Sequence, residues 1–182
     1  MQSILDTDKD LIRSVVRKDS IVVDCTMGNG GDTLFLSGLV PNGHVYAFDI
    51  QPEALVSTEK KLRENNAPDN VTLINSCHSR IKEYVHEEIS VAVFNLGWLP
   101  NHEKVITTKR ETTIPAIKSA MELLEKGGMV VIVVYPGHEE GKLEGEEIQN
   151  MLKSLDKKQY DAIMYRIINV PECPYIMGIQ KR

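Results

Sequence analysis

Short apolar runs that alternate with helical segments constrain the fold of this chain more than any other feature of its sequence. Five such runs are SIVVDC (20–25), HVYAFD (44–49), NVTLIN (70–75), SVAVFN (90–95) and MVVIVVY (129–135). They are continuously apolar rather than alternating, which is typical of parallel strands that are covered on both faces. Strands that alternate with helices predict right-handed βαβ units in an open α/β sheet.

The segments between these runs have the residue spacing of amphipathic helices. The opening helix is marked by Leu11, Ile12, Val15 and Val16. Residues 51–65 predict another helix, with a proline in its first turn. A third helix carries apolar residues at i, i+3, i+7 and i+10, namely Ile114, Ile117, Met121 and Leu124. We expect this third helix to end at Lys126-Gly127-Gly128, because glycine is typical of helix carboxyl ends.

The carboxyl-terminal part of the chain departs from this alternation. Two strand-like runs, YDAIMYRIINV (160–170) and PYIMGIQKR (174–182), are joined only by PEC. So short a connection cannot contain a crossover helix, and the two strands must therefore be antiparallel neighbours. A mostly parallel sheet with helices on both faces and a final antiparallel hairpin resembles the Rossmann-like, seven-stranded α/β fold of class I S-adenosylmethionine-dependent methyltransferases. We expect residues 1–182 to form a single domain of this type.

The composition limits the classes of protein and of partner. A length of 182 residues suits one domain with a substantial core. The formal net charge of −5 gives no general attraction to nucleic acid. There is no signal-peptide pattern and no apolar run of membrane-spanning length, so we expect a cytoplasmic location and no membrane contact. The three cysteines lie far apart and no cluster has metal-ligand spacing, so neither a disulfide nor a metal is expected.

The stretch VVDCTMGNGGDT (22–33) places three glycines after the first predicted strand. Glycine is tolerated where the backbone bends or a ligand comes close, and ligands of open α/β sheets bind beyond the carboxyl ends of the strands. The spacing Gly28-x-Gly30-x-x-Thr33 lacks the third glycine of a dinucleotide motif, and a tight turn without a ligand is the simpler alternative. The stretch resembles the first methyltransferase motif, D-x-x-x-G-x-G, and Asp24 in it suits the ammonium group of the methionine moiety.

Asp49 ends the second predicted strand. A carboxylate there can accept hydrogen bonds from both hydroxyls of a ribose, which S-adenosylmethionine shares with nicotinamide dinucleotides. In the methyltransferase fold the turn after the third strand contacts adenine, so the resemblance places Cys77 and His78 at the ring edge; a helix cap or a surface position is the alternative for His78. The residues expected to bind the cofactor are Asp24, Thr26, Met27, Gly28, Asn29, Gly30, Asp32, Thr33, Asp49, Gln51, Cys77, His78 and Asn95.

The fourth predicted strand leads into FNLGWLPNHEK (94–104). In amino-group methyltransferases the matching motif is Asp or Asn, two prolines and an aromatic residue. Here Leu96 and Gly97 stand in place of the two prolines, so the resemblance is partial. Methyl transfer to nitrogen needs a neutral amine, acceptors that aim its N–H bonds, a flat wall and exclusion of water. Asn95 can accept through its side-chain oxygen and Trp98 can stack on a base, although a single tryptophan could instead belong to the core.

The fifth predicted strand leads into YPGHEEGK (135–142), where His138 could take the proton that the methylated amine sheds. His102 and solvent are alternatives for that role. The residues expected to be catalytic are Asn95, Trp98 and His138. Those expected to contact the substrate are Gly97, Trp98, Leu99, Pro100, His102, Lys109, Arg110, Tyr135, Gly137 and His138.

Three segments taken together resemble the small bacterial rRNA-methylase-like family: TMGNGGDT, FNLGWLP with a TT-containing segment after it, and YPGHEEG. Members of that family have been assigned as tRNA wobble-uridine methyltransferases of the MnmM or YtqB type. The resemblance implies transfer of a methyl group from S-adenosylmethionine to the aminomethyl group of 5-aminomethyl-(2-thio)uridine in the tRNA anticodon. Two departures concern the substrate pocket: Trp98 stands where tyrosine is expected, and Asn101-His102 where a glycine-rich turn is commoner.

Other functions remain open at the level of the sequence. A methyltransferase acting on rRNA or on a small-molecule amine fits the same residues, because tRNA as partner rests on the resemblance alone. A nicotinamide-dependent oxidoreductase would need a third glycine in the loop, and Thr33 and the terminal hairpin argue against it. A non-catalytic binding module is the alternative from another class. The apolar hairpin could serve a homodimer.

Overall fold

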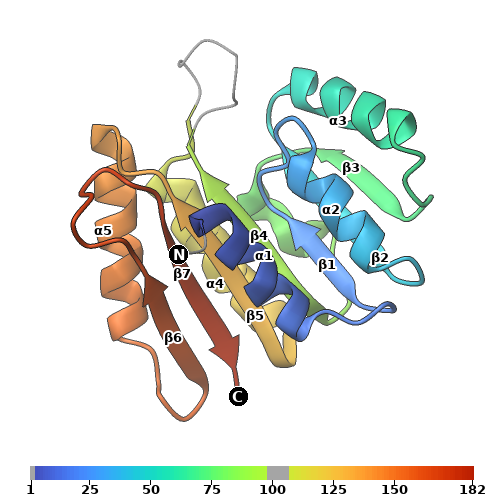
Figure 1. The fold of residues 1–182 in the computed structure, drawn as a ribbon. Helices are drawn as coiled ribbons and strands as arrows, with labels where there is room; N and C mark the ends of the chain where they lie inside the picture. The colour runs from blue at the N-terminus through green and yellow to red at the C-terminus, as the bar shows by residue number, and fades with distance from the viewer. Residues whose placement is uncertain (1–2, 98–106) are drawn as a thin grey trace.

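The computed structural model describes residues 3–97 and 107–182, and its strands form one sheet (Figure 1). The strands in this part of the chain are β1 (Ile21–Asp24), β2 (His44–Asp49), β3 (Val71–Asn75), β4 (Ile89–Leu96), β5 (Leu124–Val134), β6 (Tyr160–Tyr165) and β7 (Tyr175–Lys181). Their order across the sheet is β3-β2-β1-β4-β5-β7-β6. The first five in this order are parallel, and β7 is antiparallel to both β5 and β6. The predicted fold class is confirmed.

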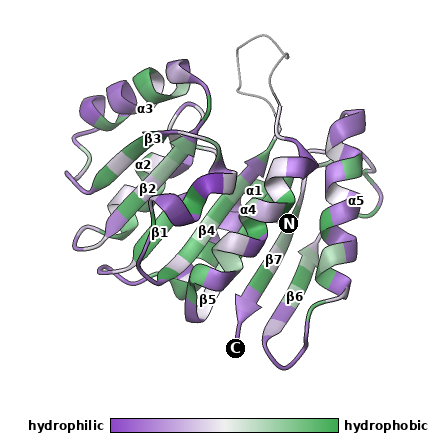
Figure 2. Ribbon diagram, turned by 180° about the vertical axis from the view of Figure 1, so that it is seen from behind, coloured by the Kyte–Doolittle hydropathy of each residue, from purple (hydrophilic) through white to green (hydrophobic). Residues whose placement is uncertain are grey.

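Helices cover both faces of the sheet, and the strands between them are the most apolar part of the molecule (Figure 2). One face is covered by α1 (Ile4–Val15), α2 (Gly31–Leu39) and α3 (Pro52–Glu64). The other is covered by the 3-10 helix η1 (His78–Glu83), α4 (Arg110–Leu123) and α5 (Glu139–Lys153). Burial on both faces explains why the parallel strands read as continuous apolar runs. No helix in the described part of the chain is long and apolar enough to cross a bilayer.

The carboxyl-terminal hairpin is antiparallel as predicted, but its strands are shorter than the apolar runs in the sequence suggest. Tyr160 pairs with Lys181, whereas β6 ends at Tyr165 and β7 begins only at Tyr175. The predicted connection of three residues was therefore wrong: residues 166–174 link the strands. Ile168, inside the run predicted as strand, is 90% exposed. It has no neighbouring strand to pack against, so its apolar character does not produce a strand there.

The end of α4 also differs from the sequence prediction. The helix ends at Leu123, and Leu124 already pairs with Ile89 in the sheet, where we expected the helix to continue to Lys126-Gly127-Gly128. The two glycines instead accommodate a register irregularity at the start of β5. Gly127 has φ +84°, and a Cβ on Gly128 would lie 3.0 Å from the carbonyl oxygens of Ile89 and Ser90. Glycine here serves a close approach of backbones inside the sheet.

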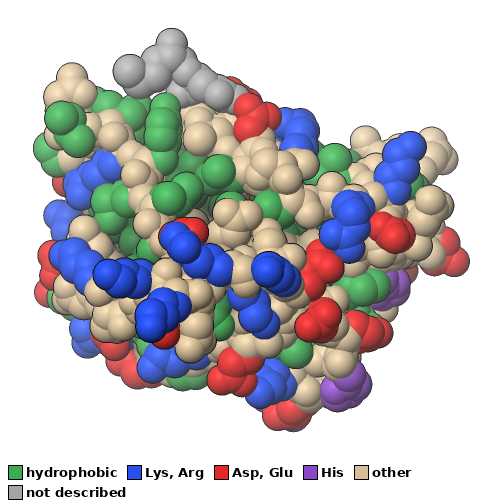
Figure 3. All heavy atoms as spheres, turned by 90° about the horizontal axis from the view of Figure 1, so that it is seen from below, with side chains coloured by type: hydrophobic (Ala, Val, Ile, Leu, Met, Phe, Trp, Pro, Cys, Tyr) green, Lys and Arg blue, Asp and Glu red, His purple; other side chains and the backbone are tan. Residues whose placement is uncertain are grey.

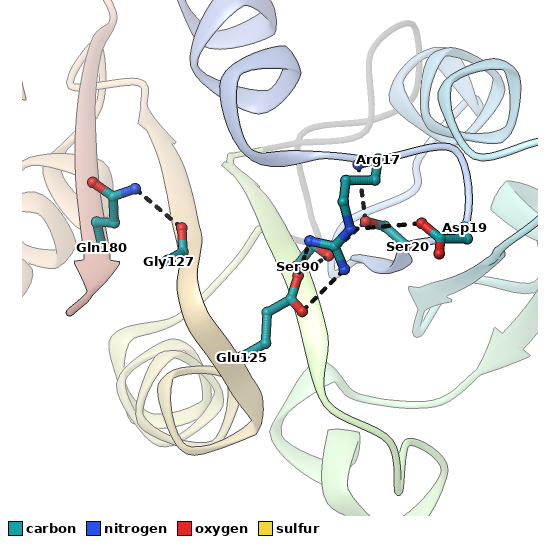
Figure 4. Close-up of polar contacts among 7 residues, drawn as sticks. All are labelled: Arg17, Asp19, Ser20, Ser90, Glu125, Gly127 and Gln180. Carbon is teal, nitrogen blue, oxygen red and sulfur yellow. Dashed lines mark hydrogen bonds and ion pairs between the residues drawn. The ribbon is translucent and has the colours of Figure 1, made fainter.

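A polar network joins three parallel strands at their amino ends (Figure 4). The Arg17 guanidinium donates to both carboxylate oxygens of Glu125, at 3.0 and 3.1 Å. The hydroxyl of Ser90 also contacts Glu125 and lies 2.6 Å from the hydroxyl of Ser20, which accepts from the Arg17 backbone N–H. The surface at this end carries Lys and Arg side chains mixed with acidic ones (Figure 3). The network therefore fixes the edge of the sheet opposite the carboxyl ends of the parallel strands.

Replacing Glu125 by glutamine should lower the free energy of unfolding at pH 7 by about 0.5–1 kcal/mol, since solvent screens the exposed guanidinium. Hydrogen bonds from Arg17 are the main cause that lowers the pKa of Glu125 from its ordinary 4.5. A lowered folded-state pKa gives stability that is present above the ordinary value and is lost as the pH falls. Urea unfolding at pH 7 and at about pH 3 should therefore show a larger difference at pH 7. The exposed Glu88→Gln variant is the control; an equal loss at both pH values would contradict the linkage.

Candidate active site

The carboxyl ends of β1, β2, β4 and β5 surround a cavity of about 820 Å³. This volume lies within the range of small-molecule sites, roughly 300–1,000 Å³. Many residues singled out from the sequence line it: Thr26, Met27, Gly28, Asn29, Asp32, Asp49, Gln51, Cys77, His78, Asn95, Gly97, Tyr135, Gly137 and His138. The cavity thus lies at the edge of the sheet where the sequence predicts a ligand.

Some of the residues singled out do not line this cavity. Asp24, Gly30 and Thr33 lie behind its wall, and Lys109 and Arg110 lie outside it. The Arg110 guanidinium faces Glu111 and Glu147 at 3.5 and 3.9 Å, so carboxylates already partner it. Four further expectations, on Trp98, Leu99, Pro100 and His102, fall on residues outside the described part of the chain.

Asp24 has a different place from the one expected of it. The residue is fully buried, and its two carboxylate oxygens accept from the Thr26 backbone N–H at 3.1 Å and from the Thr33 hydroxyl at 2.7 Å. Burial, reinforced by the charge of Asp32, raises the pKa of Asp24 to about 7. These bonds hold the loop after β1 in place, and the expected contact of Asp24 with a methionine ammonium group stays a prediction.

The glycine loop combines packing with access to the cavity. Gly30 has φ +74°, and a Cβ there would lie 2.8–2.9 Å from the side chain and Cα of Thr58 on α3. The Thr58 hydroxyl in turn donates to the Gly28 carbonyl at 3.1 Å. Gly30 thus allows the loop to pack closely on α3. Gly28 and Gly31 do line the cavity, and a Cβ on Gly31 would have no neighbour within 4 Å.

Asp49 lies at the cavity wall where β2 ends. Its carboxylate accepts from the backbone N–H of Gly28 at 3.0 Å and from that of Gln51 at 2.9 Å. These two bonds use half of the roughly four acceptor positions of a carboxylate. They hold the side chain in one orientation while its remaining lone pairs stay available. The expected pair of ribose hydroxyls is compatible with this geometry.

Two buried acceptors in the turn after β3 lack partners in the part of the chain that the structure describes. His78 Nδ1 lies 3.0 Å from the Cys25 carbonyl, which assigns its proton to Nδ1 and leaves Nε2 as an acceptor. Burial lowers the pKa of His78, so the ring is neutral at pH 7. Neither His78 Nε2 nor Ser76 Oγ has a hydrogen-bond partner among the described residues, and both side chains line the cavity. Such buried polar groups need a donor or a water, and the exocyclic amine of an adenine would suit the ring nitrogen.

The end of β4 holds Asn95 in a defined orientation. Its backbone N–H donates to the Thr26 hydroxyl at 2.7 Å, and its side-chain NH₂ donates to the Asp32 carboxylate at 2.6 Å. The NH₂ group is thereby assigned to the Asp32 side, which leaves the amide oxygen as an acceptor in the cavity wall. An acceptor at this edge is what alignment of an amine N–H requires.

His138 lies at the cavity and also ends a loop. Its Nδ1 accepts from the Gly141 backbone N–H at 3.1 Å, which makes it the N-cap of α5. A cap at a helix amino terminus satisfies one of the free N–H groups there. The expected role of His138 as a proton acceptor remains a prediction, and the structure adds this capping role to it.

Sequence reasoning missed a group of lining residues, among them Asp8 and Lys9 on α1 and Thr107, Thr108 and Thr112 before and in α4. The most informative is Asp8, which is only 2% exposed. A signal for it was present: Ile4, Asp8 and Ile12 are spaced along the buried stripe of α1, so an acid stands among apolar residues. A buried carboxylate in such a stripe requires a partner or a function.

A buried carboxylate fixes the segment that precedes α4. Glu144 on α5 is fully buried and accepts from the hydroxyls of Thr108 at 2.8 Å and Thr113 at 2.5 Å. Burial raises the pKa of Glu144. The backbone N–H of Thr108 donates to the Gly97 carbonyl at 3.2 Å, which joins the end of β4 to the start of α4. The two chain segments that enter and leave residues 98–106 are thus held together beside the cavity.

Comparisons with known proteins give the chain its relatives. The family model described as "Putative rRNA methylase" matches residues 45–181. The crystal structure of a "putative rRNA-methylase" from Clostridium thermocellum is 40% identical, with a TM-score of 0.97, and the match covers 100% of this chain and 99% of that one. A "putative methyltransferase" from Streptococcus mutans, crystallised in complex with SAH, is 38% identical with a TM-score of 0.92, over 100% and 99% of the two chains.

A curated plant protein is similar over most of the chain. The chloroplastic tRNA (mnm(5)s(2)U34)-methyltransferase of Arabidopsis thaliana is 35% identical over 179 residues, which is 92% of this chain and 65% of that protein. The chain thus spans less than two thirds of the length of this relative. The family model covers most of the chain, and the two crystal structures match it from end to end. The chain belongs to the rRNA methylase family and has the fold of the class I S-adenosylmethionine-dependent methyltransferases.

Proposed function

We propose that this protein transfers the methyl group of S-adenosylmethionine to an amine of RNA, the aminomethyl group of 5-aminomethyl-(2-thio)uridine at the tRNA wobble position. The observation that carries the proposal is the fixed amide of Asn95 at the end of β4, whose oxygen is an acceptor in the wall of an acidic cavity. Membership of an RNA-methylating family supports an RNA substrate. The wobble uridine is supported by the Arabidopsis relative, which is a tRNA (mnm(5)s(2)U34)-methyltransferase.

The residues of the cavity fit the adenosyl part of the cofactor. The unpartnered acceptor of His78 and the hydroxyl of Ser76 suit the adenine edge, and the remaining acceptor positions of Asp49 suit ribose hydroxyls. The acidic groups Asp8 and Asp32 also face the cavity and favour a cationic ligand. Bound S-adenosylmethionine supplies an electrophilic methyl group on a sulfonium centre.

The chain's own contribution to the reaction is orientation and exclusion of water. In the proposed complex, Asn95 accepts from an N–H bond of the amine through its side-chain oxygen, and Asp32 holds the Asn95 amide by the opposite end. Because the amide is fixed before the substrate arrives, little reorganisation is needed in the transition state. The nitrogen lone pair is thereby aimed along the line of displacement.

The test uses purified enzyme, labelled S-adenosylmethionine and tRNA from bacteria that lack their own wobble methyltransferase gene. After digestion to nucleosides, label should appear in 5-methylaminomethyl-(2-thio)uridine. Asn95→Ala should lower turnover at least ~10-fold while leaving the affinity for S-adenosylhomocysteine nearly unchanged, because positioning acts on the transition state. The exposed Asn42→Ala variant is the control.

Parallel reactions with ribosomal RNA and with free amines separate the other substrates. Label in ribosomal RNA, or only in a free amine, would overturn the tRNA assignment. A cytoplasmic location and contact with the anticodon region are parts of the same proposal.

A further inference from the structure

Asp8 is a buried carboxylate, and only one of its two oxygens has a hydrogen-bond partner among the described residues. Its Oδ1 accepts from the Lys9 backbone N–H at 2.6 Å, and its Oδ2 has no hydrogen bond to any described residue. The residue is 2% exposed, and the small accessible part of it belongs to the cavity wall. Burying a carboxylate in this way costs free energy unless a cation or a donor reaches it. The arrangement is that of a group that faces a ligand.

The position of α1 places Asp8 at one end of the cavity. This helix packs on β5, β4 and β7, whereas Asp49 and His78 follow β2 and β3 on the other side of β1 (Figure 1). The charge of Asp32 contributes to raising the pKa of Asp8, so the two carboxylates are close. Burial raises the pKa of Tyr135 after β5, and the charges of Asp32 and Asp8 raise it further. Asp32 also holds Asn95. Asp8 therefore lies at the end where the reacting amine is expected, away from the proposed adenosine end.

We propose that Asp8 and Asp32 together bind the protonated amine of the substrate, and that Asp8 accepts the proton this amine must lose before it is methylated. The proposal rests on the proposed function, because it names how that substrate is recognised. A primary ammonium group donates three hydrogen bonds, which suits two carboxylates and the Asn95 oxygen. Asp8 thus becomes a catalytic residue that selects amines over neutral alcohols.

The step balances without a further reactant. The ammonium group passes one proton to the Asp8 carboxylate, and the freed nitrogen lone pair forms the new N–C bond. The S–C bond breaks and its electron pair stays on sulfur, which becomes a neutral thioether. The product leaves as a secondary ammonium ion, and Asp8 returns its proton to solvent.

The electrostatic surroundings of Asp8 support a proton-accepting role. Burial is the main cause that raises the pKa of Asp8 to about 6. Among the described residues, the groups that face it are Asp6 and Lys9 on its own helix, Asp32 on α2 and Tyr135 after β5. Asp6 and Asp32 raise the pKa, while Lys9 lowers it through its charge and its backbone N–H. A carboxylate poised near neutrality can both hold and release a proton at working pH.

The ammonium group of the cofactor's methionine moiety has the same chemistry, and the experiment separates the two sources. Calorimetry on wild type and Asp8→Asn compares S-adenosylhomocysteine with 5′-methylthioadenosine, which lacks the amino-acid part. We expect both affinities to change less than about threefold, because Asp8 lies at the substrate end. A selective loss of S-adenosylhomocysteine affinity of about tenfold or more would assign Asp8 to the cofactor instead and overturn the proposal.

The decisive measurement uses wild type loaded with S-adenosylhomocysteine and two nucleosides, 5-aminomethyluridine and 5-hydroxymethyluridine. Wild type should bind the amine at least about tenfold more tightly, and Asp8→Asn should lose this preference. An absent preference in wild type would overturn the proposal even if tRNA is methylated. A preference without tRNA methylation would instead refute the proposed function and leave the amine site standing.

Kinetics with aminomethyl-bearing tRNA provide the second readout. Asp8→Asn should lower kcat/KM about 10- to 100-fold. It should also remove the fall in kcat/KM at low pH that protonation of Asp8 causes. Asp10→Asn removes the same charge from an exposed position of the same helix and should leave both quantities unchanged. Wild-type kinetics and pH dependence in Asp8→Asn would show that the carboxylate only fills space. The wild-type nucleoside comparison decides the matter if the variant does not fold.

Discussion

Replacing Asp49 by alanine should weaken the binding of S-adenosylhomocysteine by about 1.5–3 kcal/mol, the range for hydrogen bonds to a charged group. The carboxylate is held by the backbone N–H groups of Gly28 and Gln51, and its free lone pairs face the cavity. Alanine removes the acceptors for the ribose and also leaves two backbone donors without their partner. Isothermal titration calorimetry measures the change directly.

Two variants make this experiment specific. Asp49→Asn keeps the shape of the side chain but turns an NH₂ group toward one of the two backbone donors, so it should lose a large part of the same affinity. Asp69→Ala removes a carboxylate from an exposed position near β3 and should bind as wild type does. Unchanged affinity in both Asp49 variants would show that the ribose lies elsewhere.

Replacing Glu144 by alanine should lower the free energy of unfolding by about 2–4 kcal/mol, since each buried polar group left unsatisfied costs about 1–3 kcal/mol. The hydroxyls of Thr108 and Thr113 both donate to this carboxylate, and the side chain is fully buried. The substitution also opens a cavity between α4 and α5. For a chain of this size the melting temperature should fall by roughly 5–15 °C.

Glu144→Gln is the informative companion, because an amide of the same shape can still bond both hydroxyls. Burial raises the pKa of Glu144, so the charge itself contributes little that glutamine would lose. We expect this variant to keep most of the stability, and the exposed Glu146→Ala variant to match wild type in urea unfolding. If the Glu144→Ala variant unfolds at the same urea concentration as wild type, the threonine hydroxyls have other partners and the network is dispensable.

The sheet could be predicted from the sequence because its strands are buried on both faces. A run such as HVYAFD matches the bounds of β2, in which every residue is buried or half-buried. The prediction failed where an apolar residue is exposed, as at Ile168. It also failed at Gly127-Gly128, where the glycine pair accompanies an irregularity in strand pairing and not the end of a helix. Whether a segment is buried depends on which other parts of the chain pack against it, and the local sequence pattern does not show this.

The candidate site could be predicted in so far as its residues follow strand ends. Asp49 and Asn95 are visible in the sequence because the carboxyl ends of parallel strands meet at one edge. Asp24 and Gly30 belong to the same motif, yet they pack inside the wall, since a motif does not distinguish a contact from its support. Asp8 could not be placed, because its neighbours Asp32 and Tyr135 reach it only through the packing of α1 on the sheet.

The unpartnered acceptors and crowded carboxylates of the cavity make the ligand-free protein less stable than its fold alone would allow. Any molecule that satisfies these groups must raise the melting temperature, because binding to the folded state alone stabilises it by about 2.7 kcal/mol at a ligand concentration of 100 Kd. The heat stability of the protein is therefore a label-free detector of its own ligands. A panel of nucleosides, anticodon stem-loops and simple amines can be ranked in a dye-based melt without any assumption about the reaction.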